Sequence, residues 1–320
     1  MALMTRFLSK PQDKNDRNTE AVRWAYRLFL DREPESEDVL LGRSTSTAAL
    51  RSEFMASPEF NSRNSRLTLF HDDWVIKETK HGFRIFVYLN EIDISRNILI
   101  DQYETAEVSF VSETVKKGNR VIDIGANIGY YSMLFSAIVG PTGKVLSFEP
   151  IRHLFDKLSR SRSENAFESV CEIYNCALSD TTGVANMVYA PEAINFGGSH
   201  LTHGAEAPAQ HAIASVELRK LDEFSRDGRV DFIKIDVEGA EPLVFSGGRE
   251  LIARDMPIIL CEVHNDQLKN VSSSSATDMI AAMTNLGYRC NLLTEAGAVG
   301  EEIAAYDHPE PTNVVFSKAC

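Results

Sequence analysis

The chain has 320 residues, 43% of them hydrophobic and 25% charged, which is typical of a globular protein with one large α/β domain and a smaller one. Its formal net charge of −13 argues against nucleic-acid binding, which needs clustered Lys and Arg to neutralise phosphates. No stretch approaches the roughly 18 apolar residues of a membrane-spanning helix, and no signal peptide is recognisable. The five cysteines show no CxxC spacing, so a reducing, cytoplasmic location is expected.

Residues 19–60 are polar and follow a helical pattern with one break. Apolar residues recur at helical spacing in "TEAVRWAYRLFL", "REPESED" interrupts the pattern, and "STAALRSEFMASPEF" resumes it. The order of these pieces resembles a small helical domain of uncertain function that is appended to bacterial glycan-modifying and surface-associated proteins, although Asp31 stands where that family has Gly. We therefore expect residues 1–66 to form a separate helical module that serves packing or homo-oligomerisation.

Residues 67–320 are expected to form an α/β domain. Alternation in "WVIKET" and "FRIFVYL" predicts a short antiparallel lead-in within residues 67–100, and "DQYETAEVSFVSETVKKGN" predicts a helix that ends at Gly118. Apolar strand runs then alternate with helical segments, which favours a parallel sheet with crossover helices; the runs are "RVIDI", "KVLSFEP", "CEIYNCAL", "DFIKIDV" and "PIILCEV". Only a loop separates "GYRCNLLTE" from "TNVVFSKA", so these two should pair antiparallel at one edge.

The segment "VIDIGANIGYYS" at residues 121–132 has the pattern of a strand, a glycine turn and a helix. Such a corner lies at the carboxyl edge of a parallel sheet, where ligands bind. A nicotinamide dinucleotide corner needs a middle glycine, but Asn127 takes that place, and Asp123 precedes the turn. Asp123 would repel a pyrophosphate and attract an ammonium or sulfonium group. A nicotinamide-dependent dehydrogenase is therefore disfavoured.

A second acidic residue follows at the distance expected for a ribose ligand. Glu149 ends the run "KVLSFEP", 24 residues after Gly125 (149 − 125), and an acid at about this spacing accepts hydrogen bonds from ribose hydroxyls. The helix N-terminus after the turn can hold a carboxylate. A ribose joined to an amino-acid head group describes S-adenosylmethionine, which we expect to be the cofactor.

Further polar residues stand at the ends of the next two strand runs. Side chains alternate across a strand, so Lys234, Asp236 and Glu238 should share one side, and Glu262 and His264 should do the same. His264 is the first candidate for a general base and Asp236 the second, with Glu238 beside them. A divalent metal held by Asp236, Glu238 and Glu262 is a less favoured alternative, and we expect no metal.

These segments resemble, in order and spacing, the motifs of the FkbM family of S-adenosylmethionine-dependent methyltransferases. The matching pieces are "VIDIGANIGYYS", "VLSFEP", "CALSD", "VELRKLDEF", "DFIKIDVEGAEPLVFSGG" and "IILCEVH". The resemblance runs from about Gly82 to the C-terminus. It implies a Rossmann-like sheet of seven strands, mostly parallel with the last strand antiparallel, and O-methylation of a hydroxyl on a sugar, glycan or polyketide-type product.

The resemblance also implies roles for single residues. The amino-acid part of the cofactor would be bound by Asp123, Gly125, Ala126, Asn127 and Gly129. Glu149 would clamp the ribose, and the adenine would lie beside Ala177, Ser179 and Asp180. Asp236, Glu238 and His264 would face the reacting end of the cofactor, and Asp236 would also bind the cofactor. N-methylation of an amine and a catalytically inactive cofactor-binding scaffold stay open as alternatives.

Overall fold

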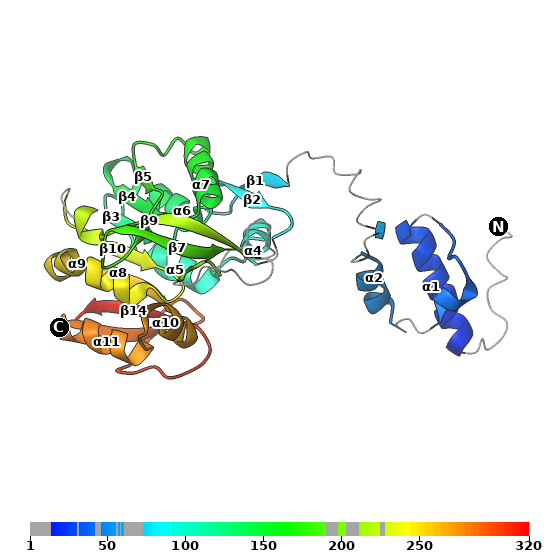
Figure 1. The fold of residues 1–320 in the computed structure, drawn as a ribbon. Helices are drawn as coiled ribbons and strands as arrows, with labels where there is room; N and C mark the ends of the chain where they lie inside the picture. Colours follow the sequence, from blue (N-terminus) through cyan, green and yellow to red (C-terminus); the bar gives the residue numbers. More distant parts are fainter. Residues whose placement is uncertain are drawn as a thin grey trace. The chain divides into compact units, whose positions relative to one another are not determined.

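The computed structural model describes residues 14–30, 32–41, 46–55, 57, 59–60, 73–91, 93–189, 198–202, 211–224 and 228–319. The chain divides into two compact units, Met1–Asp72 and Asp73–Cys320. Figure 1 shows both units in the colours of the sequence. The boundary expected between residues 66 and 67 lies outside the described residues. Among the described helices, none combines the length and the hydropathy needed to cross a membrane.

The first unit is helical, with α1 (Lys14–Leu30), the short 3₁₀ helix η1 (Glu37–Leu40) and α2 (Thr47–Met55). Its apolar core consists of Val22, Ala25, Tyr26, Leu30, Leu40, Leu50 and Phe54. Arg32, in the break between the helices, donates to Glu59 at 2.6 Å and to Glu35 at 2.8 Å, and its guanidinium lies 4.8 Å from the centre of the Tyr26 ring. Arg32 therefore links the break between the helices to Tyr26 in α1 and to Glu59.

The second unit begins with the antiparallel lead-in predicted from the sequence. β1 (Trp74–Glu78) pairs with β2 (Arg84–Tyr88), and α4 (Ile94–Leu99) and α5 (Thr105–Thr114) follow. The buried carboxylate of Glu91 caps α4, because it accepts the backbone N–H groups of Asp93, Ile94 and Ser95. α5 ends at Thr114 rather than near Gly118, because Val115 is extended and the Lys116 N–H donates to the Asn119 side chain.

The main sheet has eight strands in the order β13-β12-β14-β11-β10-β3-β4-β5. Their bounds are β3 (Arg120–Ile124), β4 (Lys144–Phe148), β5 (Cys171–Tyr174), β10 (Phe232–Ile235), β11 (Ile258–Val263), β12 (Tyr288–Leu293), β13 (Val299–Glu302) and β14 (Thr312–Lys318). The parallel centre and the antiparallel pairing of β12 with β14 are as predicted. The expected count of seven was one too few, because β13 pairs with β12 and forms the edge.

Helices cover both faces of this sheet (Figure 1). They are α6 (Tyr130–Val139), η3 (Gly140–Thr142), α7 (Arg152–Glu164), α8 (Glu241–Gly247), α9 (Arg249–Asp255), α10 (Asn265–Ser272) and α11 (Ala276–Asn285). Alternate residues of β3 enter different apolar clusters, since Val121 packs with α6 and α7 whereas Ile122 packs with α8 to α11. With both faces buried, the carboxyl edge of the sheet is where a ligand can reach it.

A second sheet, which the sequence analysis did not anticipate, has the strand order β6-β9-β7-β8. Its strands are β6 (Ala177–Leu178), β7 (Gly183–Tyr189), β8 (His200–Thr202) and β9 (Ala212–Arg219), and η4 (Leu221–Phe224) follows. The run "CEIYNCAL" is therefore two strands in two sheets. Asn175 stands between them and donates to the carbonyl oxygens of Glu149 and Pro150, which turns the chain toward the carboxyl edge.

Candidate active site

A cavity of about 360 Å³ opens where β3, β4, β10 and β11 end. The sequence-predicted residues on its wall are Asp123, Gly125, Ala126, Asn127, Glu149, Ala177, Asp236 and Glu238. The structure thus brings most of the expected cofactor residues together with two of the three catalytic candidates. In the described part of the chain, Gly129, Ser179, Asp180 and His264 are not among the lining residues.

The glycine turn is fixed against the neighbouring strands. The N–H groups of Gly125 and Ala126 both donate to the Phe148 carbonyl oxygen, at 3.1 and 2.9 Å. Gly125 has a φ of +84°, and a Cβ atom there would lie 1.8 Å from the carbonyl oxygen of Asp236. Only glycine permits this conformation and this close approach. The turn therefore holds the ends of β3, β4 and β10 in one fixed arrangement.

The same turn orients Glu149. Asn127, in a left-handed conformation with a φ of 51°, donates its N–H to Glu149 Oε2 at 2.8 Å, and the Ile151 N–H donates to Oε1 at 2.7 Å. Burial raises the pKa of Glu149 to about 7, although these two N–H groups act to lower it. Each carboxylate oxygen can accept a second hydrogen bond, so Glu149 can bind two hydroxyls while the turn holds it.

Asp123 has a carboxylate oxygen that lacks a hydrogen-bond partner among the described residues. Its side chain is fully buried, and Oδ2 accepts a hydrogen bond from Ser132 Oγ at 2.6 Å. Oδ1 is also buried, and no described residue donates to it. Burial raises the pKa of Asp123 to about 6, while the charge of Lys234 acts in the opposite direction. A buried carboxylate oxygen of this kind, on a cavity wall, fits an ammonium group.

Two expectations for the cofactor end find no support in the geometry. Gly129 has a φ of +95°, and a Cβ atom there would lie 2.5 Å from Leu158 Cδ1, so its space is used to pack α6 against α7. Ser179 follows β6, and a Cβ atom on Gly247 would lie 2.0 Å from its carbonyl oxygen, so this stretch is packed against α8. Ser179 Oγ donates to Asp180 Oδ1 at 3.2 Å. Of the three residues expected beside adenine, only Ala177 reaches the cavity wall.

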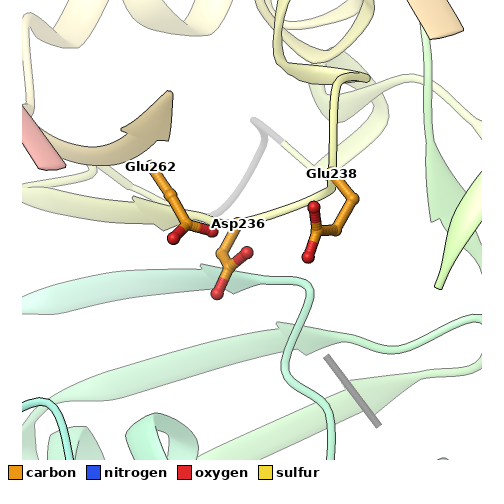
Figure 2. A group of neighbouring side chains, drawn as sticks. All are labelled: Asp236, Glu238 and Glu262. Atoms are coloured by element: carbon orange, nitrogen blue, oxygen red, sulfur yellow. The ribbon is translucent and has the colours of Figure 1, made fainter. Parts of the chain in front are cut away.

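The other end of the cavity gathers three carboxyl groups. Asp236, Glu238 and Glu262 offer oxygens that lie within 4.8 Å of one another (Figure 2). The charge of Asp236, together with burial, raises the pKa of Glu262 to about 10, and burial raises that of Glu238 to about 8. Glu238 and Glu262 therefore retain their protons at neutral pH. The spacing of the three groups would also suit a divalent cation, the alternative that the sequence left open.

Lys234 supplies the positive charge beside this cluster. Its buried ammonium donates to Asp236 Oδ2 at 3.0 Å and lies 4.6 Å from the centre of the Tyr131 ring. Burial acts to lower the pKa of Lys234, but the carboxylates of Asp236, Glu104 and Asp123 outweigh it and raise the pKa. Lys234 is therefore charged, and it fixes one oxygen of Asp236.

The sequence analysis missed the wall that Tyr103 and Glu104 form. Both line the cavity, and Tyr131 Oη donates to Glu104 Oε2 at 2.6 Å. Glu104 precedes α5 in a left-handed conformation, with a φ of 38° and a ψ of 55°. No spacing in the sequence pointed to this pair; a non-glycine residue in such a conformation is a structural signal of a functional site.

His264, which was expected to face the reacting end, is not among the described residues that line the cavity. β11 ends at Val263, and His264 caps α10 with an extended backbone (φ −129°). Its Nδ1 is buried, and the described residues provide no hydrogen-bond partner for it. The rule of alternation placed His264 beside Glu262, but His264 is not among the described residues that line the cavity. Glu262, on the strand itself, reaches the cavity instead.

The sequence profile described as the methyltransferase FkbM domain matches residues 123–290, just over half of the chain. The chain belongs to this family. Methyltransferase sdnD of Sordaria araneosa is 31% identical over 156 residues, which are 40% of this chain and 59% of that protein. The 31-O-demethyl-FK506 methyltransferase FkbM of Streptomyces tacrolimicus is 27% identical over 178 residues, 47% of this chain and 67% of that protein.

Among solved structures, the methyltransferase FkbM from Methylobacillus flagellatus KT aligns with 94% of this chain and 59% of its own length, at 15% identity and a TM-score of 0.42. The match to sdnD, reported above, spans less than two thirds of that relative's length. Residues 123–290 form an S-adenosylmethionine-dependent methyltransferase domain, and S-adenosylmethionine is the cofactor of this family. The cofactor expected from Asp123, Gly125 and Glu149 agrees with it.

Proposed function

We propose that this chain transfers a methyl group from S-adenosylmethionine to a hydroxyl oxygen of a sugar, glycan or polyketide-type acceptor. The observation that carries the proposal is the position of Asp236, on the cavity wall and with one oxygen held by Lys234 at 3.0 Å. A hydroxyl is a poor nucleophile until a base takes its proton, and a fixed carboxylate can do so. The relative named for 31-O-demethyl-FK506 methylation also supports an oxygen acceptor.

The residues of the cavity suit the cofactor. The open Oδ1 of Asp123 would bind its ammonium group, and Glu149 would accept its ribose hydroxyls. Ala177 and Leu178 would provide an apolar wall for the adenine. The glycine turn is already fixed by hydrogen bonds within the protein, so little has to be ordered when the ligand binds.

When bound, S-adenosylmethionine supplies a methyl group whose bond to the acceptor oxygen forms as its bond to sulfur breaks, the electron pair staying on sulfur. Asp236 would take the hydroxyl proton on Oδ1, because Lys234 occupies Oδ2. A positioned base contributes about 10² to 10⁴ in rate, and orientation of the reactants up to about 7–11 kcal/mol. We assign the base to Asp236 rather than His264 because Asp236 lines the cavity.

The test is transfer of label from methyl-tritiated S-adenosylmethionine to a panel of polyols, hydroxylated macrolides and amines. Against the best acceptor, Asp236→Asn should lower kcat by about 10² or more, while the affinity for S-adenosylhomocysteine is retained. Asn still accepts the Lys234 hydrogen bond, so the wall is preserved. His264→Ala is the matched comparison and should turn over normally. Lost turnover in His264→Ala with a functional Asp236→Asn would assign the base to His264.

An amine acceptor is the second candidate, favoured by the cluster of Asp236, Glu238 and Glu262, which would attract a cation. Label that appears only in amines would establish it and exclude O-methylation. Tight binding of S-adenosylhomocysteine with no labelled product from any class would instead indicate a cofactor-binding scaffold without activity.

A further inference from the structure

Lys234 stands among more negative charge than it can neutralise. Its pKa is raised by three carboxylates, those of Asp236, Glu104 and Asp123. Lys234 and these three acidic residues all line the cavity, so acidic side chains outnumber the one ammonium group among them. Buried charge of this kind is costly unless a ligand compensates it.

The Glu104 carboxyl group is positioned by contacts outside the segment that matches the family, which begins at residue 123, and by Tyr131 inside it. Glu104 belongs to the turn between α4 and α5, where Asp101 also has a left-handed φ of 56°. Asp101 accepts hydrogen bonds from Lys77 Nζ at 2.8 Å and from the Lys80 N–H at 3.1 Å, so the β1–β2 hairpin anchors the turn. Tyr131 then fixes the Glu104 carboxylate on the cavity wall at 2.6 Å.

We propose that this arrangement makes the cavity selective for charged S-adenosylmethionine over its neutral product S-adenosylhomocysteine, with Glu104 as a specificity-determining residue. The inference rests on the proposed function, in which S-adenosylmethionine is the methyl donor. The donor carries an ammonium and a sulfonium group, and each can offset part of the excess of acidic side chains around Lys234. The product carries only the ammonium group, and the carboxylate of the amino-acid part is common to both.

The discrimination is consistent with the charge balance of the reaction. Transfer removes the sulfonium charge, and the acceptor's proton moves to Asp236, so the net charge of the cavity is unchanged at first. Once Asp236 has passed this proton to solvent, the product complex carries one more negative charge than the donor complex did. Charges a few Å apart near a protein surface interact strongly enough to change an affinity by about tenfold or more. The cavity therefore binds the product less tightly than the donor, and release of the product is favoured.

Calorimetry on the full chain at about pH 7.5, above the pKa of about 6 of Asp123, tests this inference with three ligands. S-adenosylmethionine should bind about tenfold or more tightly than S-adenosylhomocysteine. Sinefungin, which has an ammonium-bearing carbon in place of the sulfonium, should bind like the charged donor. This comparison on the unaltered chain does not depend on whether a variant folds.

Variants at Glu104 then assign the effect to its charge. Glu104→Gln should lose about tenfold in affinity for S-adenosylmethionine and sinefungin and leave that for S-adenosylhomocysteine within about twofold. Glu104→Asp keeps the charge, so it should keep the preference even where the hydrogen bond to Tyr131 is altered. Glu113→Gln, at an exposed position of α5, the helix that follows Glu104, is the control and should change neither affinity.

The outcomes separate this inference from the proposed function. Equal binding of donor and product by the unaltered chain, or a Glu104→Gln variant that weakens both equally, overturns the selectivity while methyl transfer stands. Binding of none of the three ligands overturns both. A preference that Glu104→Gln abolishes and Glu104→Asp retains supports the assignment to the charge of this residue.

Discussion

Glu149→Ala is expected to weaken the binding of S-adenosylhomocysteine beyond what its effect on stability explains. The Glu149 carboxylate accepts the N–H groups of Asn127 at 2.8 Å and Ile151 at 2.7 Å. Each buried donor that loses its partner costs about 1–3 kcal/mol, so the free energy of unfolding should fall by up to about 2–6 kcal/mol. Two hydrogen bonds from ribose hydroxyls to a charged group, at about 1.5–3 kcal/mol each, correspond to a loss of more than about 10² in affinity.

The assay pairs thermal unfolding with calorimetry, and Asp255→Ala is the matched control. Asp255 is also buried, accepts the Val230 N–H at 2.9 Å and pairs with Arg254, but it lies outside the described cavity wall. Asp255→Ala should lower Tm without changing the Kd of S-adenosylhomocysteine. An unchanged Kd in Glu149→Ala would remove the ribose assignment. A Kd weakened equally in both variants would attribute the loss to stability alone.

A chain that starts at residue 67 should fold and bind S-adenosylhomocysteine like the full chain, because we expect residues 1–66 to be a separate module. An insoluble product would refute this expectation. Light scattering on the full and the shortened chain tests whether residues 1–66 cause self-association. Because the pKa of Glu262 is raised to about 10, mainly by the charge of Asp236, its contribution to stability is full below about pH 4.5 and is lost as pH rises toward 10. Glu262→Gln should therefore raise Tm by about 2 °C or more near pH 9 and leave it unchanged near pH 5, and equal shifts at both pH values would contradict the cause. EDTA should leave turnover intact, whereas a loss that magnesium restores would show that the three carboxylates hold a cation.

The positions of Asp123, Gly125 and Glu149 on one cavity wall could be predicted from the sequence because they depend on local patterns. Gly125 marks a turn that only glycine can form, and Asp123 and Glu149 end adjacent strands whose order follows from the alternation of strands and helices. The parallel centre of the sheet and the β1–β2 lead-in were confirmed for the same reason. For these elements, the pattern within each segment and the order of the segments along the chain were enough to indicate which strands pair.

The remaining walls depend on contacts that no local pattern records. Glu104 lies in a turn in which Asp101 is held by Lys77, on a hairpin distant in the sequence, and the Glu104 carboxylate is held by Tyr131. Ala177 reaches the cavity because Asn175 redirects the chain into a second sheet. His264 follows β11 directly and keeps an extended backbone, but it is not among the described residues that line the cavity. Contacts between segments that are distant in the sequence therefore limited the prediction of the site.

Acceptor selection is expected to reside in the parts of the cavity that the sequence did not reveal. A hydroxyl that reaches Asp236 must lie between this residue and the remaining walls, because the glycine turn and Glu149 would be occupied by the cofactor. Those walls come from residues 93–104, outside the family match, and from Met187 and Leu201 in the second sheet. Substitutions at Met187 or Leu201 should then change KM for the acceptor and leave the Kd of S-adenosylhomocysteine unchanged. A changed Kd for S-adenosylhomocysteine with an unaltered KM would instead show that these side chains contact the cofactor.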